Sequence, residues 1–229
     1  MTDTQGQPLA FTVADVLQRC AQQEDIILID IRPADSFEAG YITGSIAICM
    51  EDNIAECLQE LQLQAQPVIL IANDNEATYI SQLQQNGYHV LGYLKNGFAN
   101  WQLLNEPIDI LIAVETDELA MDIKFDEKLV LIDVRTEEAY DTIHLNESAN
   151  IPFSNLNDPG SMANFEEFQN IYIYGSNAYR GITACTLIKK QGIHNLRHLK
   201  GGWPAIESMP ALFNITKAAS NKKSSDNNN

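Results

Sequence analysis

The sequence predicts an α/β protein built from two similar domains, each with a mostly parallel sheet that helices cover on both faces. Two observations support this prediction. First, the 229-residue chain repeats itself, because residues 26–32 return 103 positions later as residues 129–135. A repeat of this length contains several elements and indicates two copies of a whole domain. Second, short apolar runs of strand length alternate with helix-like stretches in each copy, which favours a parallel sheet buried on both faces.

The elements of the first copy follow from local patterns. Thr12 or Asp15 can cap a helix, and Gly87 can end one because glycine adopts left-handed backbone angles. The expected order is a helix over 13–22, a strand over 26–31, a short helix over 34–39, a helix near 54–61, a strand over 68–72, a helix over 79–86 and a strand over 88–93. Functional loops of such folds lie at the carboxyl ends of the strands.

The second copy repeats these elements with one difference in length. Early positions pair at a shift of 103, whereas Gly87 pairs with Gly192 at a shift of 105. The two-residue difference lies just after residues 72 and 175, where a predicted strand ends. We therefore expect the loop at this point to differ chemically between the copies.

The domain boundary lies where the pattern is interrupted. Asn105-Glu106-Pro107 breaks the repeat, and the acidic residues at 115–118 open the second copy like a helix N-terminus. We expect a first domain over 1–107 and a second over 108–214. The remaining residues, 215–229, are rich in Asn, Ser and Lys and predict a disordered tail.

The composition argues against several classes of function. The chain has 31 Asp and Glu against 14 Lys and Arg, a net charge of -17, which disfavours binding to nucleic acid or to an anionic membrane surface. The longest apolar runs fall far short of the ~20 residues of a membrane helix. The N-terminus has no basic segment followed by an apolar one, so we expect no secretory signal and a cytoplasmic protein.

The cysteines and histidines do not predict a metal site. The four cysteines form no C-x-x-C pair, and the four histidines form neither H-x-H nor H-E-x-x-H. We expect no metal and no other cofactor. The cysteines are expected to be reduced and mostly buried; they are Cys20, Cys49, Cys57 and Cys185.

Several spaced motifs recur in the two copies. Asp30-Ile31-Arg32 corresponds to Asp133-Val134-Arg135, and Leu94-Lys95-Asn96-Gly97 corresponds to Leu199-Lys200-Gly201-Gly202. With these motifs each copy resembles the rhodanese, or thiosulfate sulfurtransferase, domain over nearly all of residues 10–213. The resemblance implies a five-stranded sheet in each domain. The pair is also similar to the tandem rhodanese half of persulfide-handling proteins that have a metallo-β-lactamase-like domain.

The resemblance implies a catalytic cysteine directly after the second apolar strand. There, backbone N–H groups and a helix N-terminus stabilise the thiolate and the persulfide. This position holds Gly175 in the second copy and Ala72 or Asn73 in the first. Ser176 is one position away, and an unactivated hydroxyl cannot carry sulfane sulfur. We therefore expect neither copy to have the nucleophile.

The second copy retains a candidate anion site. Its loop has the family length, with glycine at both ends and Arg180 where the family has a basic residue. We expect its N–H groups to bind a small oxyanion such as sulfate, phosphate or a sulfonate; the residues are Gly175, Ser176, Asn177, Ala178, Tyr179, Arg180 and Gly181. Alternatively, Arg180 is solvated or ion-paired and the loop is a relic. In the first copy Asp74 and Glu76 would repel an anion.

The other charged motif residues indicate structural roles. The resemblance implies that the Asp30/Arg32 and Asp133/Arg135 pairs tie a strand end to neighbouring loops. His144 matches a recurring histidine of the family, and we expect it to be hydrogen-bonded and structural. A lone histidine without a nucleophile performs no acid–base catalysis.

These observations lead to one hypothesis with two alternatives. The hypothesis is a catalytically inactive tandem rhodanese-like protein that acts as a binding or regulatory module in sulfur or persulfide metabolism. It would hold a small oxyanion in its second domain and act in trans with a persulfide-handling enzyme. The first alternative is a sulfurtransferase, with thiosulfate or a persulfide as donor, that uses a displaced cysteine; such a cysteine must be exposed and of low pKa. The second is an interaction module with no ligand.

Overall fold

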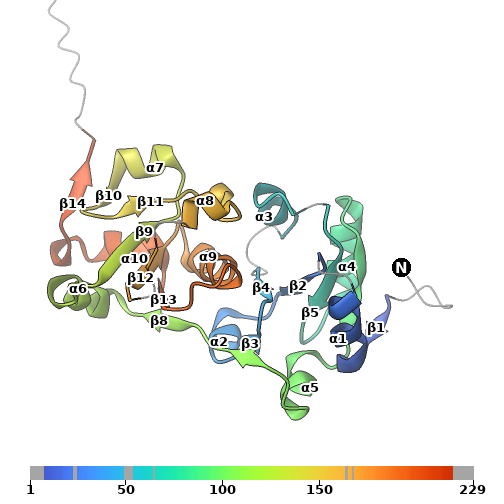
Figure 1. Ribbon diagram of the computed structural model, residues 1–229. Coiled ribbons are helices and arrows are strands. Elements are labelled where there is room, and N and C mark those ends of the chain that lie inside the picture. Colours follow the sequence, from blue (N-terminus) through green and yellow to red (C-terminus); the bar gives the residue numbers. More distant parts are fainter. Residues whose placement is uncertain are drawn as a thin grey trace, which may run out of the picture.

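The structure contains two α/β domains that lie side by side, the first at the right and the second at the left of Figure 1. The computed structural model describes residues 8–22, 25–48, 54–63, 65–162, 165–166 and 168–218. Each domain is organised around one five-stranded sheet, which confirms the predicted fold class.

All five strands of the domain-one sheet are parallel. Their order is β1 (Ala10–Phe11), β6 (Val90–Leu94), β5 (Val68–Ile71), β2 (Ile27–Asp30) and β4 (Ile46–Ala47). The helices of this domain are α1 (Val13–Gln22), α2 (Ala34–Glu38), α3 (Ile54–Glu60), α4 (Glu76–Gln85) and α5 (Gly97–Leu103).

The alternation of side chains along β2 explains why helices cover both faces of this sheet. Ile27 and Ile29 belong to one buried cluster, together with Leu58 of α3. Leu28 belongs to another, together with Val16 of α1. Successive side chains of a strand point to opposite faces, so a continuous apolar run needs cover on both sides.

Domain two repeats the same arrangement. Its parallel strands follow the order β11 (Ala149–Asn150), β9 (Leu129–Asp133), β12 (Asn170–Tyr174), β13 (Leu196–Leu199) and β8 (Ile112–Val114). Its helices are α6 (Thr116–Phe125), α7 (Glu137–Thr142), α8 (Pro159–Met162), α9 (Ala178–Lys190) and α10 (Gly202–Ser208), with the 3-10 turns η1 (Phe153–Asn155) and η2 (Pro210–Leu212). Two small antiparallel pairs join β3 (Tyr41–Ile42) to β7 (Ile108–Asp109) and β10 (Ile143–Leu145) to β14 (Ile215–Lys217).

The predicted elements of domain one are present, with differences at their ends. Helix α1 has the predicted bounds. Helix α4 begins earlier than predicted, at Glu76, because Asn75 adopts left-handed angles (φ 58°) and turns the chain into the helix there. Gly87 follows the end of α4 with φ 85°, which is the predicted left-handed stop.

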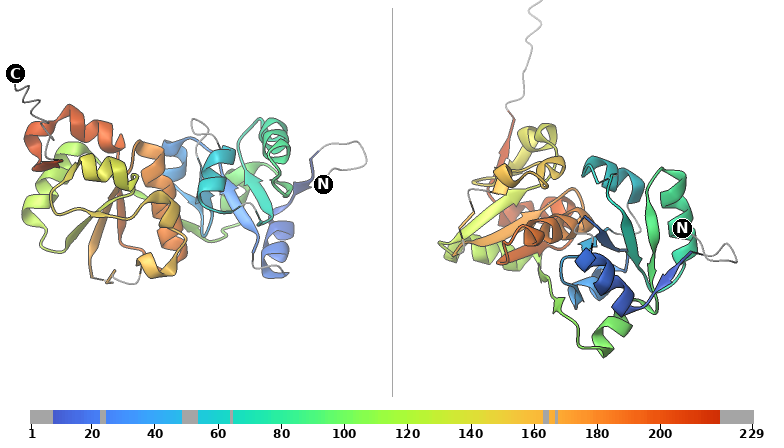
Figure 2. Two further views of the ribbon diagram at one scale, coloured as in Figure 1. Left: turned by 90° about the horizontal axis from the view of Figure 1, so that it is seen from above. Right: turned by 45° about the vertical axis from the view of Figure 1, so that its right-hand side comes forward.

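Helix α9 of domain two forms the centre of the contact between the domains, and Figure 2 shows it in orange beside the blue strands of domain one. The Thr183 hydroxyl donates a hydrogen bond of 2.7 Å to the Ala47 carbonyl at the end of β4. One apolar cluster continues from Ile46 of β4 to Ile182 and Leu187 of α9. The two domains therefore share a continuous buried core.

The connection between the domains is short. Strand β7 pairs with β3 of domain one, whereas β8 belongs to the sheet of domain two, and only Ile110 and Leu111 separate them. Residues 108 and 109 therefore pair with domain one, although the sequence assigned them to the second domain. Their backbone hydrogen bonds to β3 are the reason for this difference.

The start of the predicted disordered tail is ordered instead. Ile215–Lys217 form β14, paired with β10. Ile215 and Phe213 pack against the buried cluster around Trp203, and this apolar contact stabilises the strand. Residues 219–229 lie outside the described residues, so disorder there stays a prediction.

Candidate functional site

The candidate site lies at the carboxyl edge of the domain-two sheet, where β12 leads into α9. Strand β12 ends at Tyr174, Gly175–Asn177 form the connection, and α9 begins at Ala178. The side chain of Asn177 caps the helix by accepting a hydrogen bond of 2.9 Å from the Arg180 amide. The seven residues of the predicted anion loop thus divide into a three-residue connection and the first turn of α9.

The connection is closely packed, and glycine is required at two positions. A Cβ atom at Gly175 would lie 2.7 Å from the Cβ of Arg180. Gly202 has φ 59°, and a Cβ there would lie 2.7 Å from the carbonyl oxygens of Gly175 and Asn177. The Gly175 carbonyl also accepts a hydrogen bond of 2.8 Å from the Trp203 amide. Side chains at either glycine would force the surrounding backbone to move.

Domain one has a similar close approach between a glycine and a backbone carbonyl at the end of its strand β5. Ala72 follows β5 and is buried, and a Cβ at Gly97 (φ 56°) would lie 2.5 Å from the Ala72 carbonyl oxygen. In domain two the corresponding contact is between Gly202 and the Gly175 carbonyl. The sequence left open whether Ala72 or Asn73 corresponds to Gly175. The shared backbone contact indicates that Ala72 does.

A cavity of about 160 Å³ opens beside the connection in domain two. Its walls include Arg135, Ser176 and Arg180 of domain two. They also include Glu60, which comes from α3 of domain one. Two guanidinium groups and one carboxylate therefore line the cavity, which lies between the domains.

Arg180 is held by groups on both sides of the domain boundary. Its Nη1 lies 2.5 Å from Oε2 of Glu60, and its guanidinium carbon lies 4.3 Å from the centre of the Phe153 ring. The two charged side chains are 20% and 32% exposed. Arg180 is thus ion-paired within the protein, as one of the two interpretations of the sequence expected, while anion binding at this position stays a prediction.

Arg135 has its hydrogen-bonding groups largely occupied. Its Nη2 lies 2.6 Å from Oδ2 of Asp133 and donates another hydrogen bond of 2.6 Å to the Ile143 carbonyl. The guanidinium carbon lies 3.8 Å from the ring centre of Trp203. The pair is buried and joins the end of β9 to the start of β10.

The corresponding pair in domain one has the same geometry. Nη2 of Arg32 lies 2.7 Å from Oδ2 of Asp30 and donates a hydrogen bond of 2.8 Å to the Gly40 carbonyl. The guanidinium carbon lies 4.1 Å from the ring centre of Phe98. In both domains the pair connects the end of a strand with the backbone just after the short helix that follows.

His144 lies in β10 and contacts the preceding helix. Its Nδ1 is 2.7 Å from the Tyr140 carbonyl oxygen, and the two rings stack with their centres 3.9 Å apart. The Tyr140 hydroxyl in turn donates to the Ser148 carbonyl. His144 does not line the cavity beside Gly175.

The described cysteines lie apart from this cavity. Cys57 and Cys185 are almost completely buried, and burial raises the pKa of the Cys185 thiol. Cys20 is partly exposed, and burial raises its pKa as well, against the opposing effect of Lys190. Cys49 lies outside the described residues.

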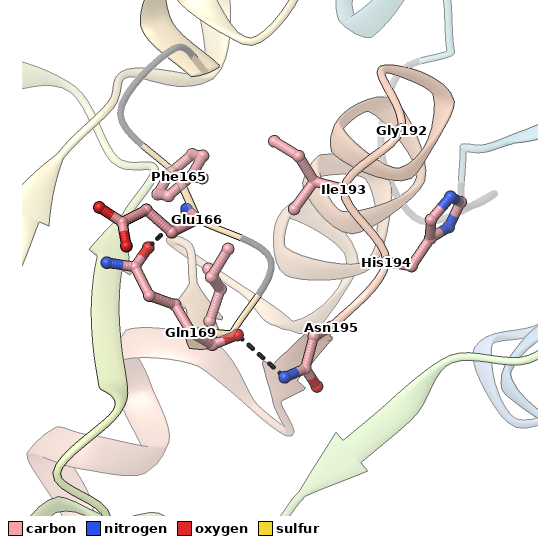
Figure 3. Close-up of a pocket in the computed structure, with 8 residues that line it drawn as sticks. Phe165, Glu166, Gln169, Gly192, Ile193, His194 and Asn195 are labelled. Atoms are coloured by element: carbon pink, nitrogen blue, oxygen red, sulfur yellow. Dashed lines mark hydrogen bonds between the residues drawn. The ribbon is translucent and has the colours of Figure 1, made fainter.

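A second cavity, of about 230 Å³, lies at the opposite edge of the domain-two sheet (Figure 3). Phe165 and Ile193 line it, and the Asn195 side chain closes one side with a hydrogen bond of 2.9 Å to the Gln169 carbonyl. His194 points away from its centre in Figure 3. We place the candidate site at the other edge, because the carboxyl ends of parallel strands are where such sheets bind ligands.

Sequence reasoning missed Glu60. It lies 120 residues before Arg180 and in the other domain. Only the way the domains pack brings its carboxylate to the cavity.

Two further findings concern metals and membranes. Among the described residues, no group of three or more His, Cys, Asp or Glu side chains lies close enough together to hold a metal ion. None of the described helices has the length and apolar character needed to span a membrane.

Comparisons with curated proteins agree with the geometry. Thiosulfate sulfurtransferase GlpE of Pseudoalteromonas translucida is 30% identical over 82 residues, which cover 35% of this chain and 76% of that protein. The probable adenylyltransferase/sulfurtransferase MoeZ of Mycobacterium tuberculosis is 32% identical over 75 residues, which cover 33% of this chain and 19% of that protein.

Solved structures and a family description were also compared with the chain. The crystal structure of thiosulfate sulfurtransferase from Pseudomonas aeruginosa aligns with 92% of this chain and 44% of its own, with 13% identity and a TM-score of 0.38. A rhodanese-like domain protein from Staphylococcus aureus aligns with 42% of this chain and 90% of its own, with 22% identity and a TM-score of 0.38. The description "Rhodanese-like domain" matches residues 12–104 and 116–209, and since these ranges cover most of both domains, the chain belongs to the rhodanese-like domain family.

Proposed function

We propose that this chain is a binding or regulatory member of the rhodanese-like family that acts in sulfur or persulfide metabolism without transferring sulfur itself. The observation that supports this proposal is the residue at each strand-to-helix connection. Gly175 and Ala72 stand where the resemblance places the sulfur-carrying cysteine. Neither residue has a nucleophilic side chain.

The ligand proposed for domain two is a small oxyanion such as sulfate, phosphate or a sulfonate. The amino end of α9 carries partial positive charge and points backbone N–H groups toward the connection. Arg180 adds a guanidinium group, which pairs with oxyanions through charge-assisted hydrogen bonds. The adjoining cavity of about 160 Å³ supplies the space.

The proposed partner is a persulfide-handling enzyme that acts in trans. Two relatives whose names include sulfurtransferase, GlpE and MoeZ, support this proposal. The net charge of -17 favours a partner with a basic contact surface, because complementary charge accelerates encounter.

A sulfurtransferase assay tests the absence of catalysis. Thiocyanate formation from thiosulfate and cyanide is measured for the wild type and for a variant with all four cysteines changed to alanine. We expect both proteins to show the background rate. A wild-type rate above background that the variant loses would contradict the proposal and support the sulfurtransferase alternative.

That alternative depends on a cysteine outside the connection. The names of the relatives favour it, and Cys20 is the described cysteine that reaches solvent. The raised pKa of Cys20 acts against it, because the thiolate is the attacking form.

A calorimetric titration tests the oxyanion site. Sodium sulfate and sodium thiosulfate are titrated into the wild type and into Arg180→Ala at constant ionic strength. We expect one binding event per chain that the variant weakens. If neither salt binds the wild type, the chain is better described as an interaction module without a small ligand.

A further inference from the structure

We infer that the carboxylate of Glu60, supplied by domain one, is a built-in competitor of the oxyanion at the domain-two site. This inference rests on the proposed function and adds a means of regulating the same site. The ion pair of 2.5 Å between Glu60 and Arg180 lies at the cavity beside Gly175, and both side chains line that cavity.

Glu60 has the chemistry of the ligand that the site would hold. A carboxylate, like sulfate, is an anion that accepts hydrogen bonds from a guanidinium group. A second anion placed against the same guanidinium would be repelled by the first, since like charges at close range raise the free energy of both. An oxyanion that binds Arg180 must therefore displace the Glu60 carboxylate.

The backbone on either side of Glu60 is fixed. Leu58 and Leu61 are both buried in the core. The Asn157 side chain of domain two also donates a hydrogen bond of 2.5 Å to the Leu61 carbonyl. Helix α3 therefore presents the carboxylate to Arg180 from a fixed position, without the ordering cost that a mobile loop would have.

The side chain can nevertheless leave Arg180 without unfolding α3. Glu60 is about one third exposed, so its carboxylate can turn into solvent by a change of rotamer. Binding of an oxyanion would then remove one polar contact between the domains. The site thus couples the occupancy of domain two to its contact with domain one.

Sulfate titration of three proteins tests this inference. The proteins are the full-length wild type, Glu60→Gln, and the control Glu127→Gln, each titrated with sodium sulfate at constant ionic strength. Glu127 is exposed and lies before β9, at the sheet edge opposite Gly175, so its substitution removes the same charge at a distance. We expect Glu60→Gln to bind sulfate about fivefold more tightly than the wild type, the factor that corresponds to a partly exposed ion pair. The control is expected to match the wild type.

The outcomes separate this inference from the function on which it rests. Equal sulfate affinity of the wild type and Glu60→Gln would overturn the inference and leave the oxyanion site intact. Absence of sulfate binding in all three proteins would overturn the oxyanion site, and the inference with it. If the control and Glu60→Gln both bound sulfate more tightly than the wild type by the same factor, the cause would be the change in net charge. This outcome would also overturn the inference. Glu60→Ala removes the carboxylate without introducing the amide of glutamine, and it is expected to reproduce the result of Glu60→Gln.

Discussion

Changing Gly175 to cysteine would place a thiol at the position proposed above for the nucleophile of the family, yet we expect this change to destabilise domain two and to leave sulfurtransferase activity at background. The reason is steric. Any Cβ at this position would lie 2.7 Å from the Cβ of Arg180, well inside the ~3.5–4.0 Å at which carbon atoms pack. It would also lie 3.3 Å from the Gly181 amide nitrogen. The first turn of α9 must therefore move.

The size of the effect follows from two contributions. Inserting atoms into a closely packed region costs about 1–3 kcal/mol. Movement of the first turn also weakens the cap between Asn177 and the Arg180 amide, and such a cap contributes about 1 kcal/mol. We expect a loss of roughly 2–4 kcal/mol, which corresponds to a decrease in Tm of about 5–15 °C for a chain of this size.

Thermal and urea unfolding of three variants measure this effect. Gly175→Cys and Gly175→Ala share the added Cβ, so both are expected to lose the same stability, whether or not a thiol is present. Gly181→Ala is the matched control, because a Cβ there meets only ordinary contacts of 3.5 and 3.7 Å. In a helix this control is expected to be neutral or to stabilise by about 0.5–1 kcal/mol. Wild-type stability of Gly175→Ala, or sulfur transfer by Gly175→Cys, would refute the steric argument.

Three further predictions concern charge and thiol chemistry. Burial acts to raise the pKa of Asp109, but hydrogen bonds from Lys189 and nearby groups lower it overall. The ion pair between Asp109 and Lys189 therefore stabilises the protein above about pH 4. This stabilisation is lost as the pH falls through the lowered pKa of Asp109. Asp109→Asn should therefore lower stability by about 1 kcal/mol at pH 7 and have little effect at pH 2, as unfolding at both pH values would show. Cys185 should resist iodoacetamide in the native protein and react only after unfolding, and labelling of native Cys185 seen by mass spectrometry would contradict its burial. Arg32→Met should lower the free energy of unfolding by about 3–5 kcal/mol, because it leaves the Asp30 carboxylate buried without its partner. A loss below about 1 kcal/mol in urea unfolding would show that this ion pair is dispensable.

Much of the fold could be predicted because it depends on patterns that are local or repeated. The apolar run at 26–31 is nearly continuous, which indicates a strand covered on both faces, and its copy at 129–134 supports the same interpretation. Gly87 could be recognised as a helix stop because only glycine adopts its backbone angles readily. The position that the resemblance implies for a catalytic cysteine was chosen from the strand that precedes it, and it stays a prediction.

What could not be predicted depends on contacts between distant segments. No local pattern around Glu60 distinguishes it from any other exposed helical glutamate, and its role depends on how α3 meets α9. Strand β14 was missed because its three residues read as part of a polar tail, and their pairing with β10 depends on the tertiary position of that edge. The correspondence between Ala72 and Gly175 could be recognised only from the backbone, where Gly97 approaches the Ala72 carbonyl and Gly202 approaches the Gly175 carbonyl.

The shared buried core of the two domains has a consequence for any ligand of the second domain. Because Leu58 and Leu61 anchor α3 in a core that both domains share, the Glu60 carboxylate remains close to Arg180 even when their ion pair is broken. Groups held close together within one chain have effective concentrations on the order of 1 mM or above. A dissolved anion would have to reach a comparable concentration, or bind more strongly than a carboxylate, before it occupied the site. A carboxylate held in place by the contact between the domains would therefore set the concentration range in which the protein responds to an anion.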